Sequence, residues 1–414
     1  MRLFDDLGKE YAKLLGARTV SNLGDGITLV AGPLLAAALT HDPLLIAGLA
    51  FAQRLPWLLF ALVSGALVDR LDRRRLMATV DILRSAAVGF LGVAVLFDFA
   101  GLALMYAVFF FVGTAETLFD TASVSVLPAV VRKEDLQKAN GRLYSAQILA
   151  NNMAGPPLGG FLFASVAALP FLLDAATFAA AAALVLTLRG SFRARLTETA
   201  EVTPPTTMRL EIAEGLFWLR QHRLLRTLVF TIGVMNLTFG AVFAVWVLYA
   251  QERLGLGPVG YGTLAAAIPV GGVLGGLVAE RLVDWVGVGT ILRAGLLVEV
   301  VTHIVLASTT SAWTAGAILV LFGFHAIVWG TVSVSLRQEL VPENLMGRVN
   351  SVYLLFDAGS ASIGALLGGL IAGSFGLTAP FWLAAGSVAA WVAVVWGALG
   401  NGAVNTARDS ANDS

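Results

Sequence analysis

Long apolar stretches alternate with short polar loops along almost the whole chain. Each stretch holds about 20 apolar residues, the length of helix that spans a bilayer core of about 30 Å. Since no run of strict apolar–polar alternation suggests a β-barrel, we expect an all-α bundle of transmembrane helices. The pattern predicts twelve spans, at residues 15–39, 43–66, 76–97, 101–126, 139–163, 168–188, 226–250, 259–281, 290–308, 313–334, 349–373 and 378–400.

The distribution of Lys and Arg predicts the orientation of this bundle. All but three of the 27 Lys and Arg residues fall near the two termini or in alternate loops, on one side of the predicted bundle. Cytoplasmic loops carry an excess of these residues, so both termini are expected to be cytoplasmic. The chain is therefore predicted to be a multi-pass protein of the plasma or inner membrane. The three exceptions are Arg253 in an opposite loop, and Arg54 and Arg84 within spans.

Composition narrows the function classes. The chain is 57% hydrophobic and 13% charged, with a mean hydropathy of +0.81, whereas soluble domains are about 25% charged. Zero net charge argues against a nucleic-acid partner. The chain has no cysteine, and its four histidines lack zinc-ligand spacing. We therefore expect no metal, no cofactor and no enzyme activity; a membrane-embedded sensor or enzyme remains a remote alternative.

A polar segment divides the chain. Residues 197–207 are rich in Thr, Glu and Pro and are typical of a linker. Residues 208–221 place apolar side chains on one helical face, which predicts an amphipathic helix on the membrane surface. The predicted organisation is an N-terminal six-helix half (1–188), a cytoplasmic linker with the surface helix (189–225), a C-terminal six-helix half (226–400) and a disordered cytoplasmic tail (401–414).

The two predicted halves resemble each other in sequence. Gly155 and Gly159 recur at a constant offset as Gly364 and Gly368, in matching predicted spans. Chance matches between Gly-rich helices are the alternative, but further matches keep the same order along the chain. Two parallel repeats of this kind place a substrate site near the membrane midplane between halves.

The loop after the second span carries a recognisable pattern. Residues 65–76 read Gly-Ala-Leu-Val-Asp-Arg-Leu-Asp-Arg-Arg-Arg-Leu, and this spacing resembles the loop between helices 2 and 3 of the major facilitator superfamily. Asp72 stands where a glycine is usual, although Asp also tolerates left-handed backbone geometry. A merely solvated charged loop is the alternative. The resemblance implies the twelve-helix fold in two pseudo-symmetric halves and a conformational clasp made by Gly65, Asp69, Arg70, Arg73, Arg74 and Asp120. In this clasp Asp69 would lie at the positive end of a helix from the other half, and Arg73 would reach Asp120.

A second pattern lies in the fifth span. Gly155-Pro156-Pro157-Leu158-Gly159-Gly160 resembles the end of the antiporter motif of that superfamily, although Asn151 stands where a glycine is usual. Close packing between helices explains these small residues equally well.

Span 1 adds the Gly-Asp pair of residues 24 and 25, and span 3 adds Asp81 and Arg84. Together these features resemble the drug:proton antiporter branch that includes macrolide and siderophore exporters. The resemblance implies export of amphipathic small molecules by proton antiport through alternating access. The open alternatives are a lipid or lysolipid carrier, or an importer. Expected partners are membrane lipid, a small-molecule substrate and protons, and we expect a monomer.

Ionisable residues within spans are candidates for proton coupling, because such groups normally face a cavity or a partner. Asp25 in span 1 and Glu116 in span 4 are the carboxyl candidates. Arg54 in span 2 lies at a similar depth to Asp25, so we expect it to pair with one of them. A static salt bridge is the alternative.

Other polar residues within spans are given structural roles. Asp81 and Arg84 are expected to neutralise each other, Asp174 to be solvated near the outer interface, and Glu299 to pair with His303, four residues later. The remaining candidates for a substrate cavity are polar or aromatic residues within spans: Asn22, Tyr106, Asn151, Asn236, Phe239, Trp246, His325, Trp329 and Asp357.

Overall fold

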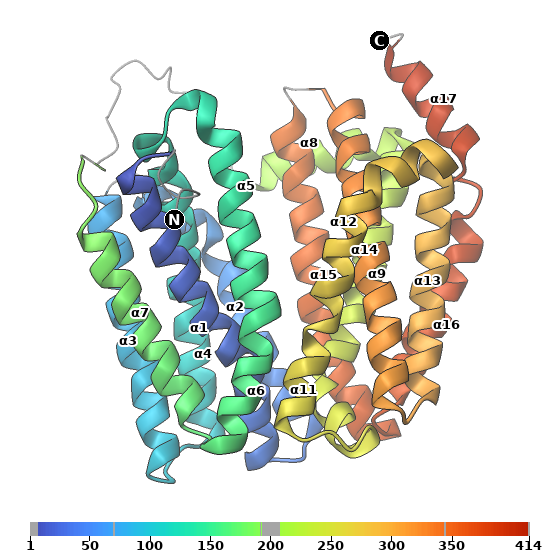
Figure 1. Cartoon of the computed structure of the whole chain (residues 1–414). Coiled ribbons are helices and arrows are strands. Elements are labelled where there is room, and N and C mark those ends of the chain that lie inside the picture. Colours follow the sequence, from blue (N-terminus) through green and yellow to red (C-terminus); the bar gives the residue numbers. More distant parts are fainter. Residues whose placement is uncertain (1–6, 69–70, 191, 193–207, 343–344, 413–414) are drawn as a thin grey trace. The chain divides into compact units, whose positions relative to one another are not determined.

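The computed structural model describes residues 7–68, 71–190, 192, 208–342 and 345–412. The described residues are almost entirely helical, without a strand among them (Figure 1). Nine of the described helices are long and apolar enough to cross a membrane. The prediction of an all-α membrane protein is therefore confirmed.

The chain divides into two compact units, here called unit 1 (residues 1–198 and 250–266) and unit 2 (residues 199–249 and 267–414). In unit 1, α3 packs against both α4 and α7, and α1 packs against α6 and α7 (Figure 1). A buried apolar core includes Tyr11, Met77 and Phe119. The helical segments of unit 1 are α1 (Lys9–Leu39), α2 (Pro43–Val68), α3 (Arg73–Leu96), α4 (Leu102–Val130), η1 (Lys133–Asp135), α5 (Leu136–Gln147), η2 (Ile148–Ala154), α6 (Gly155–Ser165), α7 (Leu169–Leu186) and α11 (Pro258–Ala265). A short π-helical segment, η3 (Tyr249–Arg253), contains the point at which the chain passes from the first stretch of unit 2 to the second stretch of unit 1.

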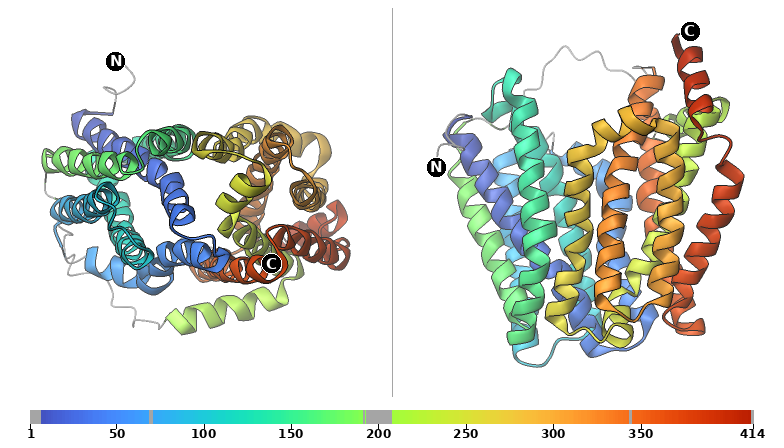
Figure 2. Two further views of the ribbon diagram at one scale, coloured as in Figure 1. Left: turned by 90° about the horizontal axis from the view of Figure 1, so that it is seen from below. Right: turned by 45° about the vertical axis from the view of Figure 1, so that its right-hand side comes forward.

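In unit 2, α15 packs against α9, α12 against α14, and α13 against α16. The helix expected at residues 208–221 is present as α8, which lies across the direction of the other helices of this unit (Figures 1 and 2); its place on the membrane surface stays a prediction. Its Leu219 is buried, whereas Leu216 is exposed; the side chains of Met208 and Ile212 lie outside the described residues. The helices of unit 2 are α8 (Met208–Gln221), α9 (Arg223–Ala244), α10 (Trp246–Leu248), α12 (Ala267–Val286), α13 (Val288–Ser308), α14 (Ala312–Leu340), α15 (Met346–Phe375), α16 (Ala379–Val395) and α17 (Asn401–Asn412).

The repeated glycines make the same kind of contact in each unit. Gly155 and Gly159 lie against the backbone of α1, and Gly364 and Gly368 lie against the backbone of α9. A Cβ atom at any of the four positions would overlap the neighbouring helix. These glycines therefore allow two helix backbones to approach closely in both units.

The turn before α3 differs from the expectation. Asp72 has φ −70° and ψ 110°, so it is not left-handed; its side chain caps α3 by accepting a hydrogen bond from the Arg75 N–H. A carboxylate at this position satisfies one of the unpaired N–H groups of the first turn, which explains why aspartate is suited here. Gly65 lies in α2, whereas Asp69 and Arg70 lie outside the described residues.

The prediction of a disordered C-terminal tail is wrong for residues 401–412, which form α17. Asn401 Oδ1 accepts a hydrogen bond from the Gly289 N–H (2.7 Å) at the start of α13, and Val404 is buried. The polar composition of the tail concealed these two anchors, a helix cap and a buried apolar side chain.

Candidate functional site

A buried arginine in unit 1 organises a cluster of carboxyl groups from neighbouring helices. Arg84 of α3 is 1% exposed, and its Nη2 donates to Asp25 Oδ1 of α1 at 2.7 Å. Its Nη1 lies 3.6 Å from Asp81 Oδ1. The guanidinium carbon lies 4.0 Å from the centre of the Phe178 ring. A planar guanidinium suits such a site because it can pair with carboxylates and stack on an aromatic face together.

This arrangement corrects one predicted pair and refines another. The expectation that Asp25 pairs with Arg54 is wrong, because its cation is Arg84, whereas Arg54 is exposed on α2. Similar depth in the membrane does not determine which way two side chains point around their helix axes. Asp81 does lie near Arg84, as predicted, but Asp25 is the nearer carboxylate.

A cavity of about 130 Å³ adjoins this cluster, and its walls include Asp25, Glu116 of α4, Asn151 of η2 and Asp174 of α7. Asp174 was expected to be solvated, but it is 1% exposed and accepts a hydrogen bond from the Thr28 hydroxyl at 2.6 Å. A threonine one turn away, at position 177, also bonds to it and was a signal available in the sequence.

The cluster therefore holds four carboxyl groups around one buried arginine. Buried charges are costly unless they are paired, so one cation cannot offset four negative charges in this setting. Binding of protons neutralises the remaining carboxyl groups. The site is thus suited chemically to hold and release protons.

The predicted fifth span contains a π-helical segment, η2, between α5 and α6. Pro156 and Pro157 follow it, and because proline lacks an N–H, two regular helical hydrogen bonds cannot form at this point. Segments of π-helix are frequent at functional sites. Here η2 brings Asn151 to the cavity wall, beside the close contact of α6 with α1. Helix packing accounts for Gly155 and Gly159 of the antiporter-like pattern.

Two charged residues assigned to the clasp, Arg73 and Asp120, have different partners from those expected. Asp120 Oδ1 pairs with Arg18 Nη2 of α1 at 3.2 Å. Arg73 donates to the Ser125 carbonyl (3.3 Å), and Arg74 donates to the Leu188 carbonyl (2.7 Å). The predicted Arg73–Asp120 pair is therefore wrong, because α1 supplies the cation instead. The role of Asp69 stays a prediction.

A larger cavity, of about 670 Å³, lies within unit 2 between α9, α13, α14 and α15. Four residues predicted to line a substrate cavity do line it: Asn236, Phe239, Trp329 and Asp357. Asn236 Nδ2 donates to Asp357 Oδ1 at 2.8 Å.

Glu299 also lines this cavity, and its pairing differs from the prediction. Its Oε2 lies 3.1 Å from His325 Nε2 of α14, and both side chains are buried. His303 instead contacts the backbone carbonyl of Glu299, with Nδ1 at 2.8 Å. The i, i+4 spacing correctly places His303 next to Glu299, but His303 contacts the backbone of that residue. The Glu299 carboxylate points instead toward the neighbouring helix, α14.

Four candidates line neither cavity. His325 is buried and lies beside Glu299. Trp246 is buried and stacks on Tyr249, with ring centres 5.2 Å apart. The Tyr106 hydroxyl donates to the Leu45 carbonyl, and Asn22 is half-buried on α1.

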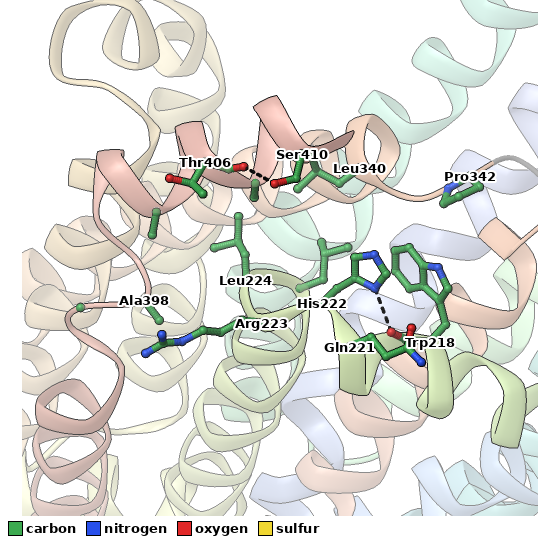
Figure 3. Close-up of a pocket in the computed structure, with 14 residues that line it drawn as sticks. Trp218, Gln221, His222, Arg223, Leu224, Leu340, Pro342, Ala398, Thr406 and Ser410 are labelled. Atoms are coloured by element: carbon green, nitrogen blue, oxygen red, sulfur yellow. Dashed lines mark hydrogen bonds between the residues drawn. The ribbon is translucent and has the colours of Figure 1, made fainter. Parts of the chain in front are cut away.

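A third hollow, of about 650 Å³, lies in unit 2 where the ends of α8 and α14, the start of α9 and α17 meet (Figure 3). The rings of Trp218 and His222 stack there at 3.6 Å, and His222 Nδ1 lies 2.9 Å from the Trp218 carbonyl. Its walls are mainly apolar. A hollow here could not be predicted from the sequence, because the tail that closes one side was expected to be disordered.

The chain matches one protein family over almost its whole length. The family described as transmembrane secretion effector matches residues 8–409. The enterobactin exporter EntS of Salmonella choleraesuis (strain SC-B67) is 27% identical over 360 residues, which cover 86% of this chain and 84% of the relative. EntS of Escherichia coli O1:K1 / APEC is 26% identical over 362 residues, covering 86% and 83%.

Solved structures show the fold. The nucleoside transporter NupG aligns with a TM-score of 0.71 and 12% identity, covering 94% of this chain and 99% of that one. A bacterial homologue of the iron transporter ferroportin, in an inward-facing state, aligns with a TM-score of 0.69 and 18% identity, covering 92% and 98%.

Proposed function

Because the chain belongs to the transmembrane secretion effector family of the major facilitator superfamily, we propose that it exports amphipathic small molecules by proton antiport. It is a multi-pass membrane transporter homologous to the enterobactin exporter EntS, and this family is a class of transporters rather than enzymes. The proposed substrates are drug-, macrolide- or siderophore-like molecules.

The observation that carries the proposal is the set of four carboxyl groups around Arg84 in unit 1. A transporter coupled to protons needs a carboxylate that gains and loses a proton as the cavity changes between wet and closed. Asp25 and Glu116 are the proposed coupling residues, because both line the cavity and neither is fully buried. The cation that pairs with the coupling carboxylate Asp25 is Arg84, in place of Arg54.

The proposal includes the rest of the transport cycle. The twelve spans form two six-helix halves that rock about a substrate site, both termini are cytoplasmic, and the protein acts as a monomer in the inner membrane. The matching glycine contacts on α1 and α9 support the repeat. Asp69 is proposed to hold the cytoplasmic side closed, as the resemblance of its loop implies.

Reconstitution into proteoliposomes tests the proposal. Enterobactin, erythromycin and a lysophospholipid are loaded, and their efflux is measured with and without an imposed pH gradient. We expect the gradient to accelerate efflux of enterobactin or erythromycin. Asp25→Asn and Glu116→Gln should each abolish the acceleration while substrate exchange without a gradient continues. Glu134→Gln, a change to an exposed acid in η1, is the matched control and should transport normally.

Efflux that is indifferent to the gradient would contradict the antiport proposal. Transport of the lysophospholipid alone would favour the lipid carrier, and normal gradient-driven efflux in both single variants would remove Asp25 and Glu116 from the mechanism.

A further inference from the structure

The hollow between α8, α9, α14 and α17, here called the α17 hollow, offers an apolar interior (Figure 3). Its volume of about 650 Å³ lies within the range of cavities that bury most of a small ligand. The stacked rings of Trp218 and His222 form one part of its wall. The hydroxyl groups of Thr406 and Ser410, which also line it, donate to backbone carbonyls of α17 itself. The interior is therefore suited to a hydrocarbon chain rather than to a polar molecule.

A cation without an acidic partner adjoins this apolar interior. Arg223 lines the α17 hollow, is exposed, and forms no ion pair among the described residues. No Asp or Glu is among the residues that line the hollow. Glu339 of α14 lies 2.9 Å from Arg408 and is already paired, and Asp409 of α17 does not line the hollow. The charge that complements this site is therefore negative.

The place of the hollow along the helices favours a lipid over a soluble anion. Two more arginines, Arg220 and Arg226, flank the turn from α8 to α9, and neither pairs with an acid among the described residues. The predicted seventh span begins at residue 226, so this turn lies at the depth of the lipid headgroups. On α8, Leu216 is 43% exposed and Phe217 is 67% exposed, as expected for a helix in contact with the membrane surface.

We propose that the α17 hollow binds an anionic phospholipid, with the phosphate beside Arg223 and part of one acyl chain inside the hollow. A guanidinium group can donate two parallel hydrogen bonds to phosphate oxygens. The orientation proposed above places this end of unit 2 at the cytoplasmic leaflet, where anionic lipids give the surface its negative potential. Binding of the lipid does not depend on the export function, and it is measured without a transport assay.

Native mass spectrometry of the purified protein in detergent measures how many lipid molecules stay bound. The probes are dioleoyl phosphatidylglycerol and dioleoyl phosphatidylcholine, which have the same acyl chains but differ in the net charge of the headgroup. We expect the wild-type protein to bind the phosphatidylglycerol about fivefold more tightly, the effect of one arginine beside an anionic headgroup.

Arg223→Gln should remove this preference by lowering the affinity for phosphatidylglycerol about fivefold, while the affinity for phosphatidylcholine stays the same. Arg281→Gln is the matched control. Arg281 is another exposed arginine of unit 2 that has no ion pair among the described residues, but it does not line the α17 hollow. This variant should keep the wild-type affinity for both lipids.

The apolar interior is tested by a second pair of variants on α17. Thr406→Phe adds a ring to the wall of the hollow and should weaken binding of both lipids several-fold, because the ring takes the place of the acyl chain. Asn405→Phe adds the same ring at an exposed position that does not line the hollow, and it should leave both affinities unchanged.

Equal wild-type affinities for the two lipids would overturn the proposal. Equal losses in Arg223→Gln and Arg281→Gln would do the same, because the effect would then come from general surface charge. Displacement of phosphatidylglycerol by glycerol 3-phosphate at matching concentrations would also overturn it and would identify a site for soluble phosphate esters instead.

Discussion

Replacing Arg84 by methionine removes the only cation that the structure places within 4 Å of Asp25 and Asp81 among the described residues. Methionine keeps an unbranched apolar stem, so the change is mainly one of charge. The lost contacts are the 2.7 Å bond to Asp25, the approach to Asp81 at 3.6 Å and the stacking on Phe178.

The expected loss follows from burial. Removing one partner of a buried ion pair typically costs about 3–5 kcal/mol, because the other partner keeps an uncompensated charge. Arg132 is the control, since its Nη1 lies at the same 2.7 Å from Glu134 although its side chain is 73% exposed. Exposed pairs contribute about 0.2–1 kcal/mol. Two ion pairs with the same N–O distance, Arg84–Asp25 and Arg132–Glu134, should thus differ several-fold in their effect on the free energy of unfolding.

Unfolding of the purified proteins by a titration with denaturing detergent, followed by tryptophan fluorescence, measures the difference. Arg84→Met should be destabilised by about 3–5 kcal/mol and Arg132→Met by less than about 1 kcal/mol. Adding Asp25→Asn to Arg84→Met should recover part of the loss, because one uncompensated carboxyl group is removed. The deficit of Arg84→Met should also shrink at lower pH, where protons neutralise the remaining acids. Equal losses in the two single variants would refute the reasoning.

Two further predictions concern packing and capping. Gly26→Ala places a Cβ against the backbone of η2 and should lower stability by about 1–3 kcal/mol in the same titration. The control Gly141→Ala, which has open space around it, should be neutral or stabilising by up to about 1 kcal/mol. Equal effects of the two changes would contradict the close contact at Gly26. Asn401→Ala removes the acceptor for the Gly289 N–H and should cost about 0.5–2 kcal/mol. Asn405→Ala, an exposed change on the same helix, should cost less than half as much, and a similar loss would count against the cap.

Much of the architecture could be predicted from the sequence, because the length and hydropathy of a segment identify it as a membrane helix. The same argument identified polar residues within spans as cavity residues. Asn151 proved to line the cavity of unit 1, and Asn236 and Asp357 line that of unit 2. A polar side chain within a span normally faces either a cavity or a polar partner. The prediction that such residues line a cavity therefore depends on residue type alone.

The choice of partner could not be predicted, because it depends on how each helix is rotated and on which neighbour lies beside it. The sequence pointed to Arg54 as the cation for Asp25 and to Asp81 as the partner of Arg84, and only the packing of α3 in unit 1 shows that Arg84 reaches Asp25. Asp120 pairs with Arg18 for the same reason. Short-range spacing identifies neighbours on one helix, whereas these pairs join two.

The π-helical segment η2 changes the number of residues in the helix that runs from α5 to α6. A π-turn holds one residue more than an α-turn, so the stretch from α5 to α6 amounts to a regular helix with one residue inserted. Asn151 lies within this segment and Gly155 directly after it, and the backbones of both lie against Gly26 of α1. The segment thus holds the part of the helix that lines the acidic cavity directly against α1. Each residue of an α-helix turns the chain by about 100°, so losing one residue from the segment would rotate the glycines of α6 away from α1 while Asn151 stays in place.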